Sequence, residues 1–168
     1  LAYTKGDARF DASEGFQHPT TVLLEDGRTM FCVFNVGHGG RCGPMRVSRD
    51  AGLTWEWAET PEQWHTVHNC PCIHSLTDAT GVTRLFVFAS TYDHVMVQAM
   101  SLDQGARWSE FRENGLRVIG PPITIQPISG NRHLALYDTA GHEILQTISA
   151  DGGLTWGAED LSAAEADG

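Results

Sequence analysis

The strongest constraint on the fold of this chain is a short motif that occurs three times. Its copies span residues 48–55 (SRDAGLTW), 101–108 (SLDQGARW) and 149–156 (SADGGLTW). All three follow the pattern Ser-x-Asp-x-Gly-x-(Thr/Arg)-Trp, and their Asp residues lie 53 and 48 residues apart. Self-similarity at a regular spacing of this size is typical of repeat architectures, in which each copy marks one structural unit.

The residue types inside the motif predict a tight turn between two strands. Ser and Asp side chains can hydrogen-bond nearby backbone N–H groups and thereby hold a bend. Gly adopts the positive φ that residues with a Cβ avoid, and Trp adds a large apolar group on the outgoing strand. A calcium loop is the functional alternative, but one Asp per copy supplies too few oxygen ligands for that ion.

Three extended segments precede every copy of the motif, and the middle one is always the most apolar. They are 19–24, 29–36 and 44–47, then 71–76, 84–89 and 95–100, then 123–128, 133–137 and 143–148. Turn signals such as Asp26-Gly27 join the first and second segments, and a fourth strand leaves each copy through its Trp. We therefore predict an all-β chain of three four-stranded antiparallel units, each a blade of a β-propeller.

The motif resembles the Asp box, or bacterial neuraminidase repeat, and the chain is similar to part of a sialidase-superfamily β-propeller. The stretch Phe16-Gln17-His18-Pro19 stands where sialidases carry F-R-I-P at the start of their first blade. The resemblance implies a single domain over 1–168, half of a six-bladed propeller. Its blades are expected at about 17–64, 65–116 and 117–164, with 1–16 as an edge strand or a swapped arm.

An arc of three blades leaves two apolar faces uncovered, which monomers rarely tolerate. We expect a homodimer that completes a six-bladed ring with two-fold symmetry. The alternative is that the chain is a fragment of a longer protein.

A polar rim is the predicted binding site. Because strands alternate in direction, the loops between second and third strands share one rim with the starts of the first strands. In the sialidase family this rim holds the active site. Here we predict glycan-binding residues at His18, His38, Arg41, Asn69, Tyr92, Asp93, His94 and His142. The competing interpretation is that polar residues simply collect in loops.

Sialidase catalysis is not expected. Sialidases clamp the substrate carboxylate with three arginines and use an Asp as acid/base, but the position of the first arginine is Gln17 here. The loop that would supply the Asp, 35–43, holds no carboxylate. A neutral amide cannot replace a bidentate cationic clamp.

The prediction is therefore carbohydrate recognition without sialidase catalysis. One alternative is a divergent glycoside hydrolase using Asp93 or Asp138 with rim histidines. The other is a non-catalytic scaffold that assembles into a ring.

Charge excludes two classes of partner. The chain has 21 acidic and 11 basic residues, a net charge of -10. This argues against binding nucleic acid or an anionic membrane surface. The sequence has no apolar run of about 18 residues that would span a membrane. No signal peptide is visible; because the chain begins at Leu1, a trimmed N-terminus and export stay open.

No metal or cofactor is predicted. The stretch 68–74 carries His or Cys at alternate positions, but six residues of strand extend about 20 Å, too far for four ligands of one zinc ion. The four cysteines are too few for a disulfide framework, and a Cys42–Cys70 disulfide stays open. Trp57 and Trp64 could stack on sugar rings, but we favour packing in an outer strand for both.

Overall fold

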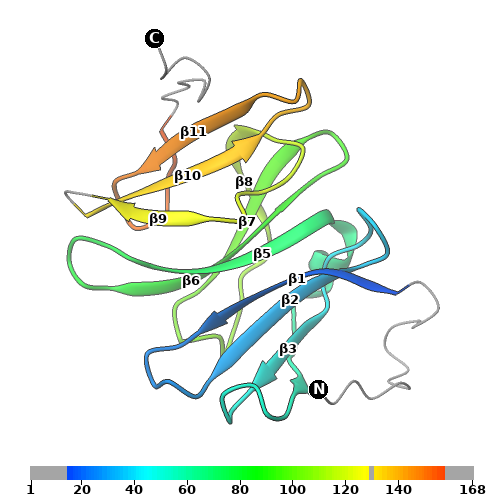
Figure 1. Ribbon diagram of the computed structural model, residues 1–168, viewed down its shortest axis with the longest axis vertical. Helices are drawn as coiled ribbons and strands as arrows, with labels where there is room; N and C mark the ends of the chain where they lie inside the picture. Colours follow the sequence, from blue (N-terminus) through cyan, green and yellow to red (C-terminus); the bar gives the residue numbers. More distant parts are fainter. Residues whose placement is uncertain (1–14, 129–130, 158–168) are drawn as a thin grey trace.

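The computed structural model describes residues 15–128 and 131–157 of the chain. Over these residues the protein consists of antiparallel sheets stacked one after another (Figure 1). The first sheet contains β1 (Phe16–Leu23), β2 (Met30–Val36), β3 (Met45–Ser48) and β4 (Glu56–Trp57). The second contains β5 (His68–Thr77), β6 (Thr83–Ser90), β7 (Val95–Ser101) and β8 (Arg112–Arg117). The third contains β9 (Ile125–Ile128), β10 (Arg132–Asp138) and β11 (Ile144–Ser149).

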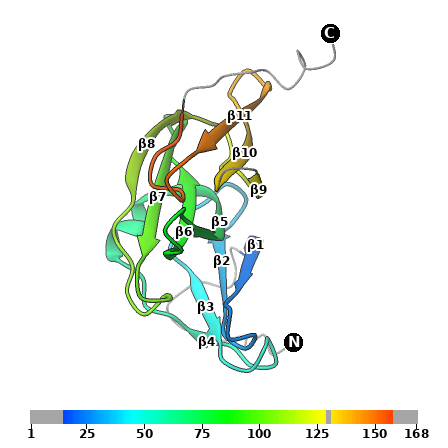
Figure 2. The same ribbon diagram turned by 90° about the vertical axis from the view of Figure 1, so that its left-hand side faces the viewer.

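The expectation of an all-β fold made of antiparallel sheets is confirmed. The strands β1, β5 and β9 lie on one side of the molecule, with β8 on the opposite side (Figure 2). A short 3₁₀ helix, η1 (Glu62–Thr66), connects β4 to β5. The proposed arm at 1–16 and the fourth strand predicted in the third unit lie largely outside the described residues.

Two apolar clusters hold the sheets together, and β6 contributes to both. Leu85, Val87 and Ala89 pack against the first sheet, where they meet Phe31 and Val33. The alternate side chains Phe86 and Phe88 pack toward the third sheet. Successive side chains of a strand point to opposite faces, so a strand covered on both faces is a continuous apolar run. This explains the sequence Leu-Phe-Val-Phe-Ala at 85–89.

The three copies of the motif form the same hydrogen-bonded turn, which we call the repeated turn (48–55, 101–108 and 149–156). In the first copy the Ser48 hydroxyl donates to Asp50 at 2.8 Å and accepts the Gly52 N–H at 2.8 Å. The Asp50 carboxylate accepts the Thr54 N–H at 2.8 Å. Equivalent bonds recur in the other copies. Each buried Ser therefore joins the two ends of the bend.

The second and third repeated turns also pack on the sheet that precedes them. Trp108 meets Phe31 of the first sheet edge-to-face at 6.1 Å, and Trp156 meets Phe88 of the second sheet at 5.8 Å. A Cβ added at Gly105 would overlap the ring of Phe31. These two turns therefore help to set the spacing between neighbouring sheets.

Candidate functional site

The loops divide between two ends of the sheets. At one end the β1–β2 turn adjoins the first repeated turn, where the Ala51 N–H donates to the Arg28 carbonyl at 2.8 Å. The β2–β3 loop meets the start of β5 at the other end, where the Asn69 N–H donates to the Gly40 carbonyl at 3.0 Å. We call this second end the polar rim; it comprises 15–18, 37–44, 58–70, 90–94 and 138–142.

His18 and His38 form a pair on the polar rim. His18 Nε2 lies 3.3 Å from His38 Nδ1, and the same His38 nitrogen lies 3.2 Å from Gln17 Oε1. His18 has a φ of 53° and falls where the pairing of β1 with β2 shifts register. The irregular start of β1 therefore turns this imidazole toward the β2–β3 loop. Both rings are exposed.

A second group joins Arg41, His68, Asn69 and Tyr92. Arg41 and His68 form an isolated β-bridge, and the ring of Tyr92 stacks on His68 with 3.9 Å between ring centroids. Burial, and then the nearby Arg41 charge, lower the pKa of His68. The Asn69 side-chain amide donates to the Ile119 carbonyl, so it also fastens the start of β5 to the segment leading to the third sheet.

The remaining predicted residues lie on separate turns. Asp93 and His94 belong to an exposed turn in which the His94 N–H donates to the Thr91 carbonyl at 3.0 Å. His142 ends a matching turn, with its N–H 2.9 Å from the Thr139 carbonyl. Asp138 accepts the Gly120 N–H at 3.1 Å. The structure thus brings together part of the predicted set, around His38 and Arg41, and places the rest at turn tips.

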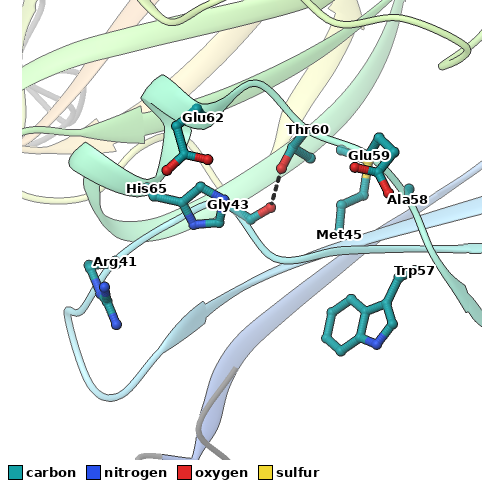
Figure 3. A pocket seen from close by; sticks show the side chains of 9 residues that line it. All are labelled: Arg41, Gly43, Met45, Trp57, Ala58, Glu59, Thr60, Glu62 and His65. Carbon is teal, nitrogen blue, oxygen red and sulfur yellow. Dashed lines mark hydrogen bonds between the residues drawn. The ribbon is translucent and has the colours of Figure 1, made fainter. Parts of the chain in front are cut away.

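A pocket of about 380 Å³ opens on the polar rim beside Arg41 (Figure 3). The β2–β3 loop, β3, β4 and the connection that contains η1 form its walls. Its lining residues are Arg41, Gly43, Met45, Trp57, Ala58, Glu59, Thr60, Glu62 and His65. In Figure 3, Arg41 and Trp57 lie at opposite ends of this group, with Glu62 close to His65. The wall therefore combines one guanidinium, two carboxylates, a hydroxyl, an imidazole and an indole.

The Gly43 backbone lies close to both Thr60 and His65 in the wall of the pocket. The Thr60 hydroxyl donates to the Gly43 carbonyl at 2.9 Å. Gly43 has a φ of +110°, and a Cβ there would lie 2.6 Å from His65 Nδ1. Only glycine allows both this backbone conformation and the close approach of the imidazole.

Trp64 anchors the helix η1 to the segment between β7 and β8. Its side chain is 1% exposed, its indole N–H donates to the Ser109 carbonyl at 3.0 Å, and its ring packs on Phe111 at 4.7 Å. Trp64 is therefore a packing residue, as expected, but it lies in η1 and not in an outer strand. Trp57 packs against Phe34 at 6.0 Å and beneath the Arg46 guanidinium at 3.9 Å, but it also lines the pocket.

Sequence reasoning missed most of this pocket. Of the predicted rim residues only Arg41 lines it, because the list omitted the connection between β4 and β5. The alternation of strand direction could have located this connection. The fourth strand starts at a repeated turn, so it must end at the opposite rim, where the connection begins. The residues of that connection carry no repeat signal, and its 3₁₀ turn has no amphipathic pattern.

Metal ligands do not cluster in the part of the chain that the structure describes. Among residues 15–128 and 131–157, no three His, Cys, Asp or Glu side chains group so that they could hold a metal ion. All four cysteines are free thiols in the structure. Burial raises the pKa of Cys32 to about 11 and also raises that of Cys42 and Cys72.

No helix within the described ranges has the length and hydropathy needed to cross a membrane.

Comparison with known proteins places the fold. Neither the models of known protein families nor the curated proteins match this sequence. Among solved structures, a protein of unknown function from Dyadobacter fermentans matches at 18% identity and TM-score 0.56, over 76% of this chain and 36% of its own. The NanB sialidase from Streptococcus pneumoniae matches at 12% identity and TM-score 0.56, over 96% of this chain and 46% of its own.

A fucose lectin from Kordia zhangzhouensis, solved with methyl-fucoside, matches at 13% identity and TM-score 0.50. The match covers 85% of this chain and 99% of the lectin chain. The chain thus spans less than half the length of the first two structures and nearly the whole of the third. At these identities the likeness establishes an all-β fold that resembles sialidase propeller structures.

Proposed function

We propose that this chain is a sialidase-like Asp-box propeller module that recognises carbohydrate without sialidase catalysis. The observation that carries the proposal is the pocket beside Arg41 on the polar rim, with its mixed polar and aromatic wall. Small-molecule sites typically occupy about 300–1,000 Å³, and the pocket falls within that range.

The lining matches the surface of a sugar ring. Sugar hydroxyls both donate and accept hydrogen bonds, while carboxylates accept and a guanidinium donates in a fixed planar geometry. Glu59 and Arg41 supply both functions, and the Trp57 indole with Ala58 supplies apolar surface for the C–H face. The likeness to a fucose lectin supports the same ligand class.

The rest of the polar rim can extend the contact beyond one sugar. The bridge between Arg41 and His68 links the pocket to the exposed ring of Tyr92, and His38 lies on the same loop as Arg41. In this proposal a longer glycan reaches from the pocket toward these groups and the turns of Asp93, His94 and His142. His18 and Asn69 contact the same loop, through the His38 ring and the Gly40 carbonyl respectively.

Sialidase chemistry has no support at this rim. Gln17 stands in the place of the first arginine and contacts His38 at 3.2 Å. The Asp138 carboxylate is bound to the Gly120 N–H, which favours a structural role over the divergent hydrolase alternative.

The proposal is tested with a glycan array followed by calorimetry on the strongest hit. Arg41→Ala and Glu59→Gln should each weaken binding at least about tenfold, the loss of one or two hydrogen bonds to a charged group. Arg112→Ala, at an exposed position of β8, is the matched control and should bind as the parent does. Absence of binding across the array, or full affinity in Arg41→Ala, would contradict the proposal.

The proposal includes a second copy of this chain as partner, so that two sets of three blades close one six-bladed ring. The third sheet supports it: its Ala135 and Tyr137 face the second sheet, whereas Leu136 (46% exposed) and Ile144 (49% exposed) lie on uncovered surface. The first sheet packs on one face of the second sheet, and the third sheet packs on its other face. The first sheet of a second copy is therefore the surface that continues the stack.

A further inference from the structure

The three repeated turns share one geometry but differ in what packs against them. The second turn packs on the first sheet and the third turn on the second sheet, through Trp108 and Trp156. The first turn belongs to the first sheet, which lies at one end of the stack (Figure 1). Among the described residues, a Cβ built on Gly52 meets only Met30 of the same sheet and Trp55 of the same turn within 4 Å. The first turn therefore presents a surface that its two counterparts use for packing.

The third turn shows how such a surface is held. The Gln98 amide of the second sheet donates to the Gly153 carbonyl at 3.0 Å, and the Trp156 indole N–H donates to Gln98 Oε1 at 3.2 Å. One glutamine thus bonds both the glycine and the tryptophan of the motif. In the first turn these two groups bond each other, since the Trp55 indole N–H donates to the Gly52 carbonyl at 3.1 Å. A glutamine amide placed beside them would replace that one bond with two.

The third sheet carries a glutamine at the matching position. The serine that opens each motif copy pairs with the middle strand of its sheet, so the three sheets can be aligned residue by residue. Three residues before that serine stand Met45 in the first sheet, Gln98 in the second and Gln146 in the third. Gln98 lies opposite Phe88, and Gln146 lies opposite Leu136. Leu136 is 46% exposed, so this face of the third sheet is uncovered.

The junction between the first two sheets provides a comparison without the glutamine. Met45 has no amide, and the indole N–H of Trp108 is buried with no hydrogen-bond partner among the described residues. A glutamine at this position is therefore what satisfies the indole of the motif where two sheets meet.

We infer that the first repeated turn is the docking site for the third sheet of a second copy, whose Gln146 amide bonds the Gly52 carbonyl and the Trp55 indole. The inference rests on the second copy proposed above as partner and adds the surface and the residues that join the two chains. Leu136, opposite Gln146, packs against the Trp55 ring. The contact continues the packing already present between neighbouring sheets of one chain, and two copies form it twice.

A mixing experiment tests this contact between chains. Trp55→Phe and Gln146→Met each remove one side of it, so either variant alone forms a dimer with two damaged junctions. A mixed dimer has one intact junction. Native mass spectrometry on an equimolar mixture, with one variant isotope-labelled, counts the three dimers. Mixed dimers should be at least about threefold more abundant than independent junctions allow, because the two residues interact only across the junction.

The dissociation constant of each variant gives a second readout. Trp55→Phe and Gln146→Met should each raise the Kd of the dimer about tenfold, because hydrogen bonds are lost at both junctions. Gln98→Met is the matched control, since it removes the same amide from the junction inside one chain. It should lower Tm and leave the Kd unchanged. Mixed with Trp55→Phe, it should give mixed dimers at the abundance expected for independent junctions.

The outcomes separate this inference from the proposals on which it builds. Dimers that show no excess of the mixed form would overturn the docking site while the second copy stands as partner. A parent chain that stays monomeric would overturn both, and carbohydrate recognition would then stand or fall by the glycan array alone. A blank array together with an excess of mixed dimers would refute carbohydrate recognition and uphold the docking site.

Discussion

At the scale of single residues, the aspartates of the repeated turn explain why the motif recurs. The hydroxyl and the backbone N–H of Thr54, followed by the Ser48 hydroxyl, lower the pKa of Asp50 to about 2. In the second copy the Arg107 side chain replaces the threonine hydroxyl, and the pKa of Asp103 is again lowered to about 2. The motif therefore tolerates Thr or Arg at its seventh position because either side chain donates to the carboxylate.

These lowered pKa values predict how stability depends on acid. An Asp in the unfolded chain has a pKa near 3.9, above its folded value here. Its stabilising contribution is complete above about pH 4 and is lost as the pH falls toward about 2. We expect Tm, followed by circular dichroism, to fall over this range. The triple variant Asp50→Asn/Asp103→Asn/Asp151→Asn should have a lower Tm at neutral pH and a shallower acid decline; an unchanged decline would refute this account.

Gly43 gives a second test at this scale, because it shapes the pocket wall. Gly43→Ala should lower the free energy of unfolding by about 1–3 kcal/mol, from its left-handed backbone and the contact with His65, and should abolish sugar binding. Gly81→Ala is the control: its φ is +85°, but nothing lies within 4 Å of an added Cβ. Urea denaturation and calorimetry should show the smaller stability loss and intact binding in the control. Equal behaviour of the two variants would count against a built wall.

At the scale of elements, the strands were predictable, as was the rim at which the β4–β5 connection lies, but the fold of that connection was not. An apolar run such as 85–89 can be covered on both faces only inside a stack of sheets, so its sequence indicates both strand and position. The helix η1 has one buried anchor, Trp64, and its packing partners Ser109 and Phe111 lie more than 40 residues away. A pattern along the local sequence cannot reveal such a distant contact.

The glycines of the three repeated turns test how sheets are spaced. Gly52, Gly105 and Gly153 have φ of +87°, +87° and +93°, so Ala strains the backbone equally in all three. An added Cβ would overlap Phe31 at Gly105 and lie 2.5 Å from Leu76 at Gly153, but 3.4 Å from Met30 at Gly52. Gly105→Ala and Gly153→Ala should therefore cost about 1–3 kcal/mol more than Gly52→Ala in chemical denaturation. A uniform cost across the three would mean that these turns do not set the spacing.

At the scale of the whole molecule, the sequence indicated the fold class and the end of the sheets at which the candidate pocket lies. The motif and strand alternation led to the polar rim. The motif and the strand alternation did not lead to the pocket. Its charged side chains come from the connection of β4 to β5 as well as from the β2–β3 loop. The closed ring stays a prediction, since it depends on a surface outside this chain.

Light scattering over a concentration series tests the ring. A stable species near twice the 18.4 kDa of one chain is expected. Leu136→Asp and Ile144→Asp should shift it to the monomer by placing charge on the uncovered face of the third sheet. Val82→Asp, at a similarly exposed apolar position in the β5–β6 turn, should leave the dimer intact. A folded, monodisperse monomer at all concentrations would remove the second copy from the proposal.

The most direct test of the central claim, carbohydrate recognition beside Arg41, is amide chemical-shift mapping by NMR during titration with methyl galactoside and methyl fucoside. The account predicts saturable shifts for at least one sugar, concentrated at 41–43 and 58–66 and weaker along the start of β5. Shifts that cluster elsewhere, for example at the end that carries the repeated turns, or none with either sugar, would contradict it.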